Sequence, residues 1–122
     1  MGSISFMSAS KLATYNRQKC INLLEKITKN LFRMYRNDET TKEQFTERFF
    51  FLKKQLDTLG NIVLNSDYHR EMKIYIENLA STLSWNFNLE EMRSTHMAKL
   101  NHIQSIKTST SYNRKSREDD GQ

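Results

Sequence analysis

The sequence contains no proline, one cysteine and three glycines, at Gly2, Gly60 and Gly121. Because glycine and proline supply most tight turns, their scarcity argues against a sheet with many turns and favours helices. The single thiol, Cys20, has no partner for an intramolecular disulfide, and small secreted domains normally depend on several such bridges. We therefore expect a helical protein in a reducing, intracellular compartment.

Long apolar runs are also missing from the sequence. No stretch approaches the roughly 18 apolar residues of a membrane-spanning helix, and the first residues lack the basic and apolar regions of a secretory signal. Phe6 stands where an N-myristoylation signal has serine or threonine. With 122 residues and a hydrophobic fraction of 37%, the chain suits one domain with a modest core, so we expect partners to contribute to its stability.

Apolar residues recur at steps of three and four along most of the chain, which confines them to one side of a helix. These stripes predict three main helices, over residues 10–37, 41–60 and 67–88. The stripes are Cys20, Leu23, Leu24, Ile27, Leu31, Met34 and Tyr35; then Phe45, Phe49, Leu52, Leu56 and Leu59; then Met72, Ile76, Leu79, Leu83 and Phe87.

Polar residues mark the helix ends. Thr40 with Glu43, or Thr41 with Gln44, has the spacing of a capping box at the start of the second helix. Gly60 is suited to end that helix, because glycine adopts a left-handed conformation without penalty. Ser66 or Asp67 is expected to cap the third helix.

A fourth helical stripe, shifted from the third, covers residues 89–107. It either bends from the third helix around residues 86–88 or runs on as a projecting arm. Residues 108–122 offer no apolar stripe and are predicted to form a disordered tail, and residues 1–9 a flexible N-terminus. The predicted fold class is therefore all-α: a small antiparallel three-helix bundle or coiled-coil domain over residues 10–107, with an extended or bent fourth helical segment.

The net charge is +5, and part of the basic excess is clustered. Five cations recur at helical steps on the side of the first helix opposite its apolar stripe: Lys19, Lys26, Lys29, Arg33 and Arg36. Such a basic face could neutralise nucleic-acid phosphates or meet an acidic partner. The alternative is an ordinary solvated face, with part of its charge answered by acidic residues of the second helix.

Large aromatic residues lie off the predicted core stripes. Phe32, Phe50 and Phe51 each need a second apolar contact, because exposing three phenylalanines is costly for a monomer. A neighbouring helix of the same bundle is one candidate for that contact, and a partner protein is the other. Trp85 is either a core anchor or an interface hot spot.

Catalytic and metal-binding patterns are not apparent. Cys20 lies on a core stripe, where a thiol is usually inert, and His69, His96 and His102 are dispersed. One cysteine and three separated histidines make no recognisable zinc site, and no glycine-rich phosphate loop occurs. We expect no enzyme activity, no cofactor and no bound metal.

Three segments resemble the Mediator complex subunit 30 family of transcription cofactors. They are Thr28–Asn37, Phe49–Lys54, and Leu83–Asn88 followed by Met92 and Arg93. A second resemblance, carried by Leu56–Ile62 and Glu71–Lys73, is to small coiled-coil subunits of the lysosome-related-organelle biogenesis complex.

Both families imply a non-enzymatic helical subunit that packs against other subunits in a homo- or hetero-oligomer. The first resemblance implies a role in transcription and a nuclear rather than cytoplasmic location. The second implies endosomal or lysosomal trafficking. A basic helical nucleic-acid-binding module is the third alternative.

Overall fold

The computed structural model describes the backbone of residues 9–120 and the side chains of residues 11–107. The described residues form helices joined by short connections and contain no strand, which confirms the predicted all-α class. Its helices are α2 (Ala9–Arg36), α3 (Lys42–Asp57), α4 (Asp67–Leu83) and α5 (Leu89–Asp120). Most of the segment predicted as a flexible N-terminus, residues 1–8, lies outside the described residues.

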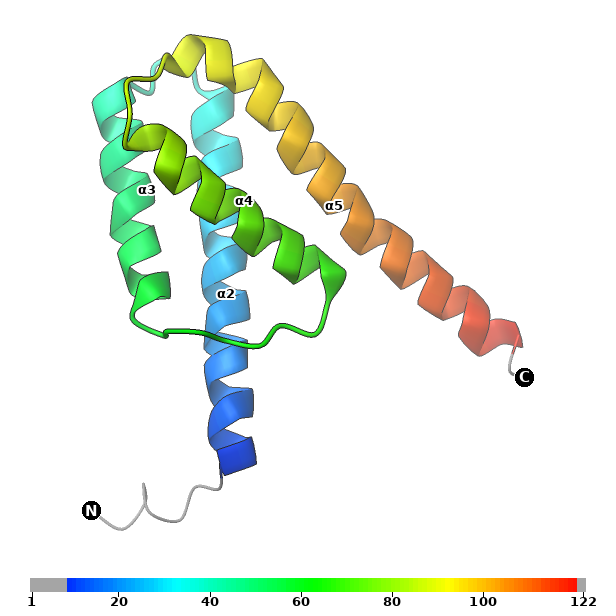
Figure 1. Ribbon diagram of the computed structural model, residues 1–122. Helices are drawn as coiled ribbons and strands as arrows, with labels where there is room; N and C mark the ends of the chain where they lie inside the picture. The colour runs from blue at the N-terminus through cyan, green and yellow to red at the C-terminus, as the bar shows by residue number, and fades with distance from the viewer. Residues whose placement is uncertain (1–8, 121–122) are drawn as a thin grey trace.

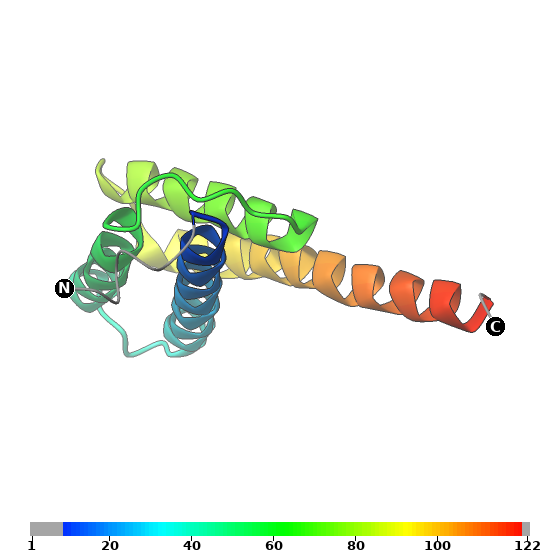
Figure 2. The same cartoon turned by 90° about the horizontal axis from the view of Figure 1, so that it is seen from below.

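The helices form two pairs that pack across one another. α2 and α3 run antiparallel, as do α4 and α5, and the second pair lies obliquely across the first (Figures 1 and 2). α2 contacts all three other helices, and α5 contacts both α2 and α4. The largest fully buried side chains are Phe45, Phe49, Leu24, Ile27, Leu31, Leu52, Met72, Ile76, Leu79, Leu100 and Cys20.

The fourth segment differs from its prediction. α4 ends at Leu83 rather than at residue 88, and α5 turns back along α4 instead of continuing or bending from it. The reversal has a local cause, because the Asn88 side chain accepts a 3.2 Å hydrogen bond from the backbone N–H of Glu91 and so caps a new helix. Leu100 and Ile103 are buried, so α5 joins the bundle, which over the described residues has four helices rather than three.

The C-terminal part of α5 projects beyond the other helices (Figures 1 and 2). The helix continues past residue 107 to Asp120, into a segment for which the sequence predicted disorder. Extending an existing helix avoids the unfavourable nucleation step, so a polar segment without a core stripe is able to continue it.

For each predicted helix start, the structure shows which of the two alternative residues forms the cap. Thr41 and Gln44 form the capping box, with Gln44 N–H donating to Thr41 Oγ1 at 3.1 Å and Thr41 N–H to Gln44 Oε1 at 3.0 Å. Ser66, rather than Asp67, caps α4. Gly60 follows α3 with a φ of +72°, the left-handed conformation expected of it.

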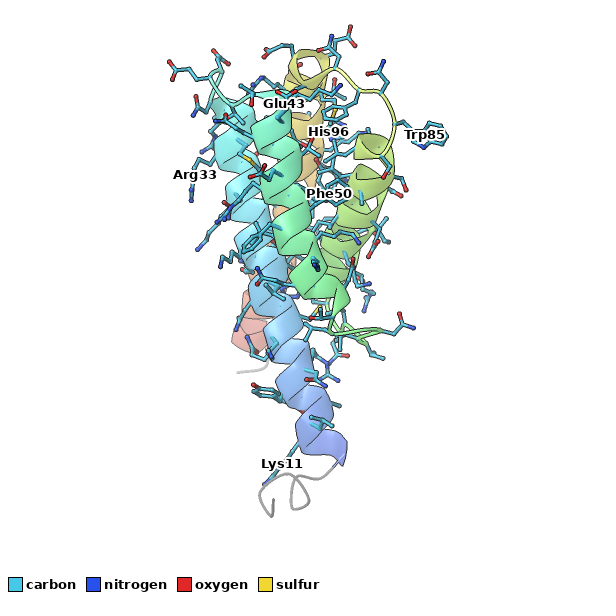
Figure 3. All side chains as sticks on the ribbon, turned by 90° about the vertical axis from the view of Figure 1, so that its left-hand side faces the viewer. Lys11, Arg33, Glu43, Phe50, Trp85 and His96 are labelled. Carbon is cyan, nitrogen blue, oxygen red and sulfur yellow. The ribbon has the colours of Figure 1, made fainter. Side chains whose placement is uncertain are left out.

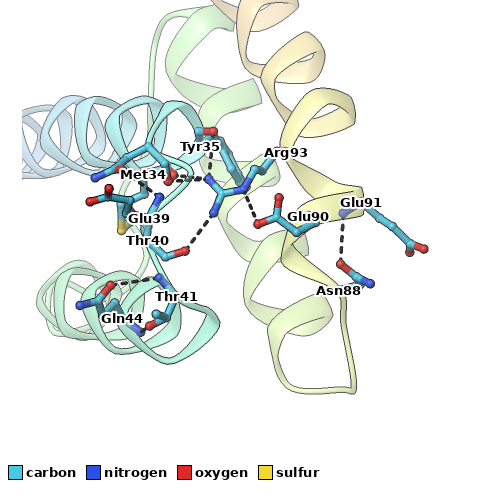
Figure 4. A network of polar contacts seen from close by, with 11 residues as sticks. Met34, Tyr35, Glu39, Thr40, Thr41, Gln44, Asn88, Glu90, Glu91 and Arg93 are labelled. Carbon is cyan, nitrogen blue, oxygen red and sulfur yellow. Dashed lines mark hydrogen bonds and ion pairs between the residues drawn. The ribbon is translucent and has the colours of Figure 1, made fainter.

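One buried arginine fixes the connection between α2 and α3 (Figure 4). From α5, the Arg93 guanidinium donates to the backbone carbonyl oxygens of Met34, Tyr35 and Asn37 at 2.8, 3.1 and 2.8 Å. It also donates to the Thr40 carbonyl at 2.9 Å and forms an ion pair with Glu90 at 3.1 Å. A side chain of α5 therefore holds the α2–α3 pair at the end where the two helices are connected.

Candidate protein-binding face

The four predicted interface aromatics fall into two groups. Phe32 and Phe50 are half-buried and pack against the core. Phe51 is 57% exposed and Trp85 is 79% exposed. Figure 3 shows Trp85 extending away from the helices. The internal contact that the sequence left open thus applies to Phe32 and Phe50, and only Phe51 and Trp85 present most of their surface to solvent.

Phe50 receives its contact from its own bundle. Its ring meets that of the buried Phe49 edge-on, with centroids 5.2 Å apart. Phe51 is the next residue and is turned about 100° around the helix axis, which directs it toward the outer side of the α2–α3 pair. The Arg48 guanidinium lies over the Phe51 ring, 5.6 Å from its centroid.

Phe51 lies between two hollows on this outer side. The first, of about 660 Å³, is lined by Lys19, Asn22, Leu23, Phe51, Lys54, Gln55, Thr58 and Leu59. The second, of about 470 Å³, is lined by Met34, Thr40, Gln44, Glu47, Arg48 and Phe51. We call this surface the Phe51 groove and define it by the residues of both hollows.

The predicted basic face lies on the outer side of α2, beside the Phe51 groove. All five of its side chains, from Lys19 to Arg36, are exposed. Within the described part of the chain, none of them forms an ion pair, so the acidic residues of α3 leave this charge unanswered. Two of these cations lie over aromatic rings instead. The Arg36 guanidinium lies 5.3 Å from the centroid of the Phe32 ring, and the Lys19 ammonium lies 5.4 Å from that of Tyr15.

Trp85 belongs to a separate position, on the connection between α4 and α5. It borders a shallow hollow of about 390 Å³ whose other lining residues are Lys42, Glu43, Thr46, Glu47, Leu83 and Phe87. Glu47 of α3 also lines the second hollow beside Phe51, so it lies between the two exposed aromatics.

A buried polar chain joins α2, α4 and α5. Tyr35 and Tyr75 hydroxyls lie 2.8 Å apart, and Tyr75 Oη lies 2.8 Å from His96 Nδ1. Burial raises the pKa of both tyrosines, and burial together with the nearby Lys99 lowers the pKa of His96. Tyr75 and His96 also line an open groove of about 530 Å³ between α4 and α5.

These polar groups form no recognisable catalytic or metal arrangement. Cys20 is fully buried, and burial raises the pKa of its thiol, which keeps it protonated. The described residues contain no cluster of three or more potential metal ligands of the His, Cys, Asp and Glu types. Over the same part of the chain, no helix has the length and apolarity needed to cross a membrane.

No protein-family description, curated protein or solved structure was found to match this chain. Its function therefore has to be argued from its own surface and chemistry.

The sequence predicts Phe51 and the basic face as site residues, but it does not predict most of what surrounds Phe51. The apolar periodicity predicts that Leu23 and Leu59 lie on the core stripes, and Arg48 and Lys54 are not among the predicted site residues. In the structure these two leucines are only partly buried and line the groove. A usable signal was present, because Lys54 follows Phe51 by three residues and so shares its side of α3.

Proposed function

We propose that this chain is a non-enzymatic helical adaptor, or subunit of a multiprotein assembly, that binds another protein through the Phe51 groove. The observation that carries the proposal is the 57% exposure of Phe51 between two hollows. Binding energy at protein interfaces is concentrated in a few large side chains, aromatic ones above all, that a partner covers.

The surroundings of Phe51 support a protein partner. Leu23 and Leu59 add apolar surface on one side of the ring, and polar residues such as Gln55 and Thr58 edge the hollow. An apolar centre with a polar rim is the usual composition of a protein–protein interface. The groove is also open, which suits a segment of a partner better than an enclosed small molecule.

The non-enzymatic part of the proposal rests on the chemistry of the buried groups. Cys20 is sealed in the core, and the raised pKa values of Tyr35 and Tyr75 keep both hydroxyls protonated near neutral pH. A nucleophile requires a lowered pKa or a neighbouring base and access to a substrate. The Mediator, organelle-biogenesis and nuclear assignments remain predictions from the sequence.

An affinity experiment with matched variants tests the proposal. The full chain, its Phe51→Ser variant and its Ile74→Ser variant are immobilised, and retained proteins are identified. Ile74 is the control because it is 52% exposed on α4, close to the exposure of Phe51. Each retained protein is then purified, and its affinity for the three chains is measured.

We expect at least one protein whose affinity falls about tenfold or more with Phe51→Ser and stays within about twofold with Ile74→Ser. Equal affinities of all retained proteins for the wild-type and Phe51→Ser chains would show that the Phe51 groove is not the binding surface.

A further inference from the structure

We propose that the Phe51 groove binds an acidic amphipathic helix of a partner protein, with an apolar side chain of that helix beside Phe51 and its carboxylates beside Lys19, Arg48 and Lys54. This inference rests on the proposed protein-binding function and adds the chemical class of the partner. Three observations carry it: the charge of the groove, its length and its apolar lining.

The charge of the groove is strongly one-sided. The larger hollow is lined by Lys19 and Lys54 and by no acidic residue. The smaller hollow contains one cation and one acid, Arg48 and Glu47. Across the described residues, none of these three cations is held in an ion pair. The adjoining basic face of α2 extends the same field, so a partner with carboxylates gains complementary contacts beside the larger hollow and along α2.

The length of the groove fits a helix. The two hollows share Phe51 and extend along α3 from Gln44 to Thr58. At 1.5 Å per residue this distance is about 21 Å, the length of roughly four helical turns. Amphipathic helices bind such grooves through apolar residues at steps of three and four, and their flanking positions then face the rims. Lys19 of α2 and Lys54 of α3 line the larger hollow together with Phe51 and the two leucines.

The lining disfavours two other occupants. A second copy bound symmetrically through this surface would bring together two surfaces that each carry three cations and only one acid, Glu47. Nucleic acid would use the cations but leave Leu23 and Leu59 without apolar partners. The Arg48 guanidinium also covers the Phe51 ring, which hinders a base from stacking there.

The test uses the full chain and fluorescent helical peptides of about 15 residues, built from alanine, a stripe of leucines and flanking glutamates. Two further peptides replace every glutamate with glutamine or with lysine, and a short single-stranded DNA is the nucleic-acid probe. Affinities are measured by fluorescence anisotropy at low and physiological salt. The chains compared are the wild type, Phe51→Ser, Lys19→Gln with Lys54→Gln, and two controls.

The controls match each change elsewhere on the molecule. Ile74→Ser removes a similarly exposed apolar side chain from α4. Lys99→Gln with Lys107→Gln removes two positive charges from α5. This control chain therefore has the same net charge as the Lys19→Gln and Lys54→Gln double variant. Circular dichroism melting confirms that all variants are folded.

We expect the glutamate peptide to bind about tenfold or more tightly than the glutamine and lysine peptides. Its affinity should fall about three- to tenfold in the Lys19 and Lys54 double variant, in line with two exposed ion pairs, and at least about tenfold in Phe51→Ser. Both control chains should bind the glutamate peptide with an affinity within about twofold of the wild-type value. The preference should weaken as salt increases.

Other results overturn the inference. The glutamine peptide binding as well as the glutamate peptide, or no glutamate binding up to about 1 mM, would show that the groove does not select acidic helices. Tighter binding of DNA, with a steep salt dependence that Phe51→Ser leaves unchanged, would assign the basic surface to nucleic acid. If these results occur while a captured protein still depends on Phe51, the proposed function stands and only the partner class is wrong.

Discussion

The guanidinium of Arg93 in α5 donates a 2.8 Å hydrogen bond to the backbone carbonyl of Met34, in the last turn of α2. The last carbonyls of a helix have no partner within the helix, and they carry the negative end of its dipole. The buried Arg93 cation hydrogen-bonds to such a carbonyl oxygen and also lies favourably at the negative end of the dipole. The same group reaches Thr40, so it also fixes the chain that leads into α3.

Replacing Arg93 with methionine, which keeps much of the stem volume, should lower the free energy of unfolding by about 2–4 kcal/mol. The substitution removes the guanidinium donor from the buried carbonyl oxygens of Met34 and Tyr35 and from the partly buried carbonyl oxygen of Thr40, and hydrogen bonds to charged groups are among the stronger ones. Urea denaturation measures the change. Arg33→Met is the control, because Arg33 is exposed and should tolerate the change within about 0.5 kcal/mol. Equal effects of the two substitutions would contradict the structural role of Arg93.

The adjacent residues Phe50 and Phe51 should respond differently to the same substitution. Phe50→Ser removes a half-buried ring from the core and should cost about 1–3 kcal/mol of stability. Phe51→Ser should cost less than about 1 kcal/mol, since its ring is mostly exposed and loses little beyond the Arg48 contact. Urea denaturation of both variants checks this contrast. A larger loss from Phe51→Ser would place that ring in the core instead.

Acidification should destabilise the protein partly through His96. Burial lowers the pKa of this histidine from its ordinary value of 6.5, so the folded state holds its proton less tightly than the unfolded chain. Stability from this group is therefore complete above pH 6.5 and is lost as the pH falls below it. Tyr35 and Tyr75 contact the ring, and Lys99 opposes its protonation.

The measurement is the free energy of unfolding at pH 7.5 and pH 5 for the wild type and for His96→Gln. The variant should lose less stability between the two pH values than the wild type does. His69 requires its own variant, because burial lowers its pKa too and its contribution has the same sign. An unchanged pH dependence in His96→Gln would show that this histidine titrates alike in both states.

Gly60→Ala should cost about 1–2 kcal/mol, although there is room for the added methyl group. A Cβ at this position would meet nothing within 4 Å, so no clash is involved. The cost arises because a φ of +72° is unfavourable for an L-residue with a side chain. Asn tolerates this region better than Ala, so Gly60→Asn should lose less. A thermal melt that ranks alanine above asparagine would contradict this explanation.

The helices could be predicted from the sequence because their signals are local. The apolar steps and the Thr41–Gln44 capping box act within a few residues, and both are present as predicted. The sequence predicts too late an end for α4, at residue 88 rather than Leu83, because Leu83 and Phe87 have helical spacing. Phe87 instead lies on the segment that connects α4 to α5, and its side chain is partly buried against the core. The Lys42 ammonium lies over its ring, 4.6 Å from the centroid.

The candidate site could be predicted only in part, because it depends on where neighbouring helices lie. Phe50 and Phe51 look equivalent in the sequence, and only the packing of the bundle shows that Phe50 meets the core. The periodicity placed the basic face on the outer side of α2, but it could not show that the acids of α3 leave it unpaired. Arg93 carried no local signal, since its carbonyl partners lie 53 to 59 residues away.

That separation has a consequence for how the chain matures during synthesis. The ribosome releases α2 and α3 well before Arg93 in α5, so their connection emerges before the guanidinium that hydrogen-bonds its carbonyl oxygens. The early hairpin has its apolar stripes but lacks the cation that fixes its turn. We therefore expect the Phe51 groove, which is built on these two helices, to reach its final geometry only after Arg93 has left the exit tunnel.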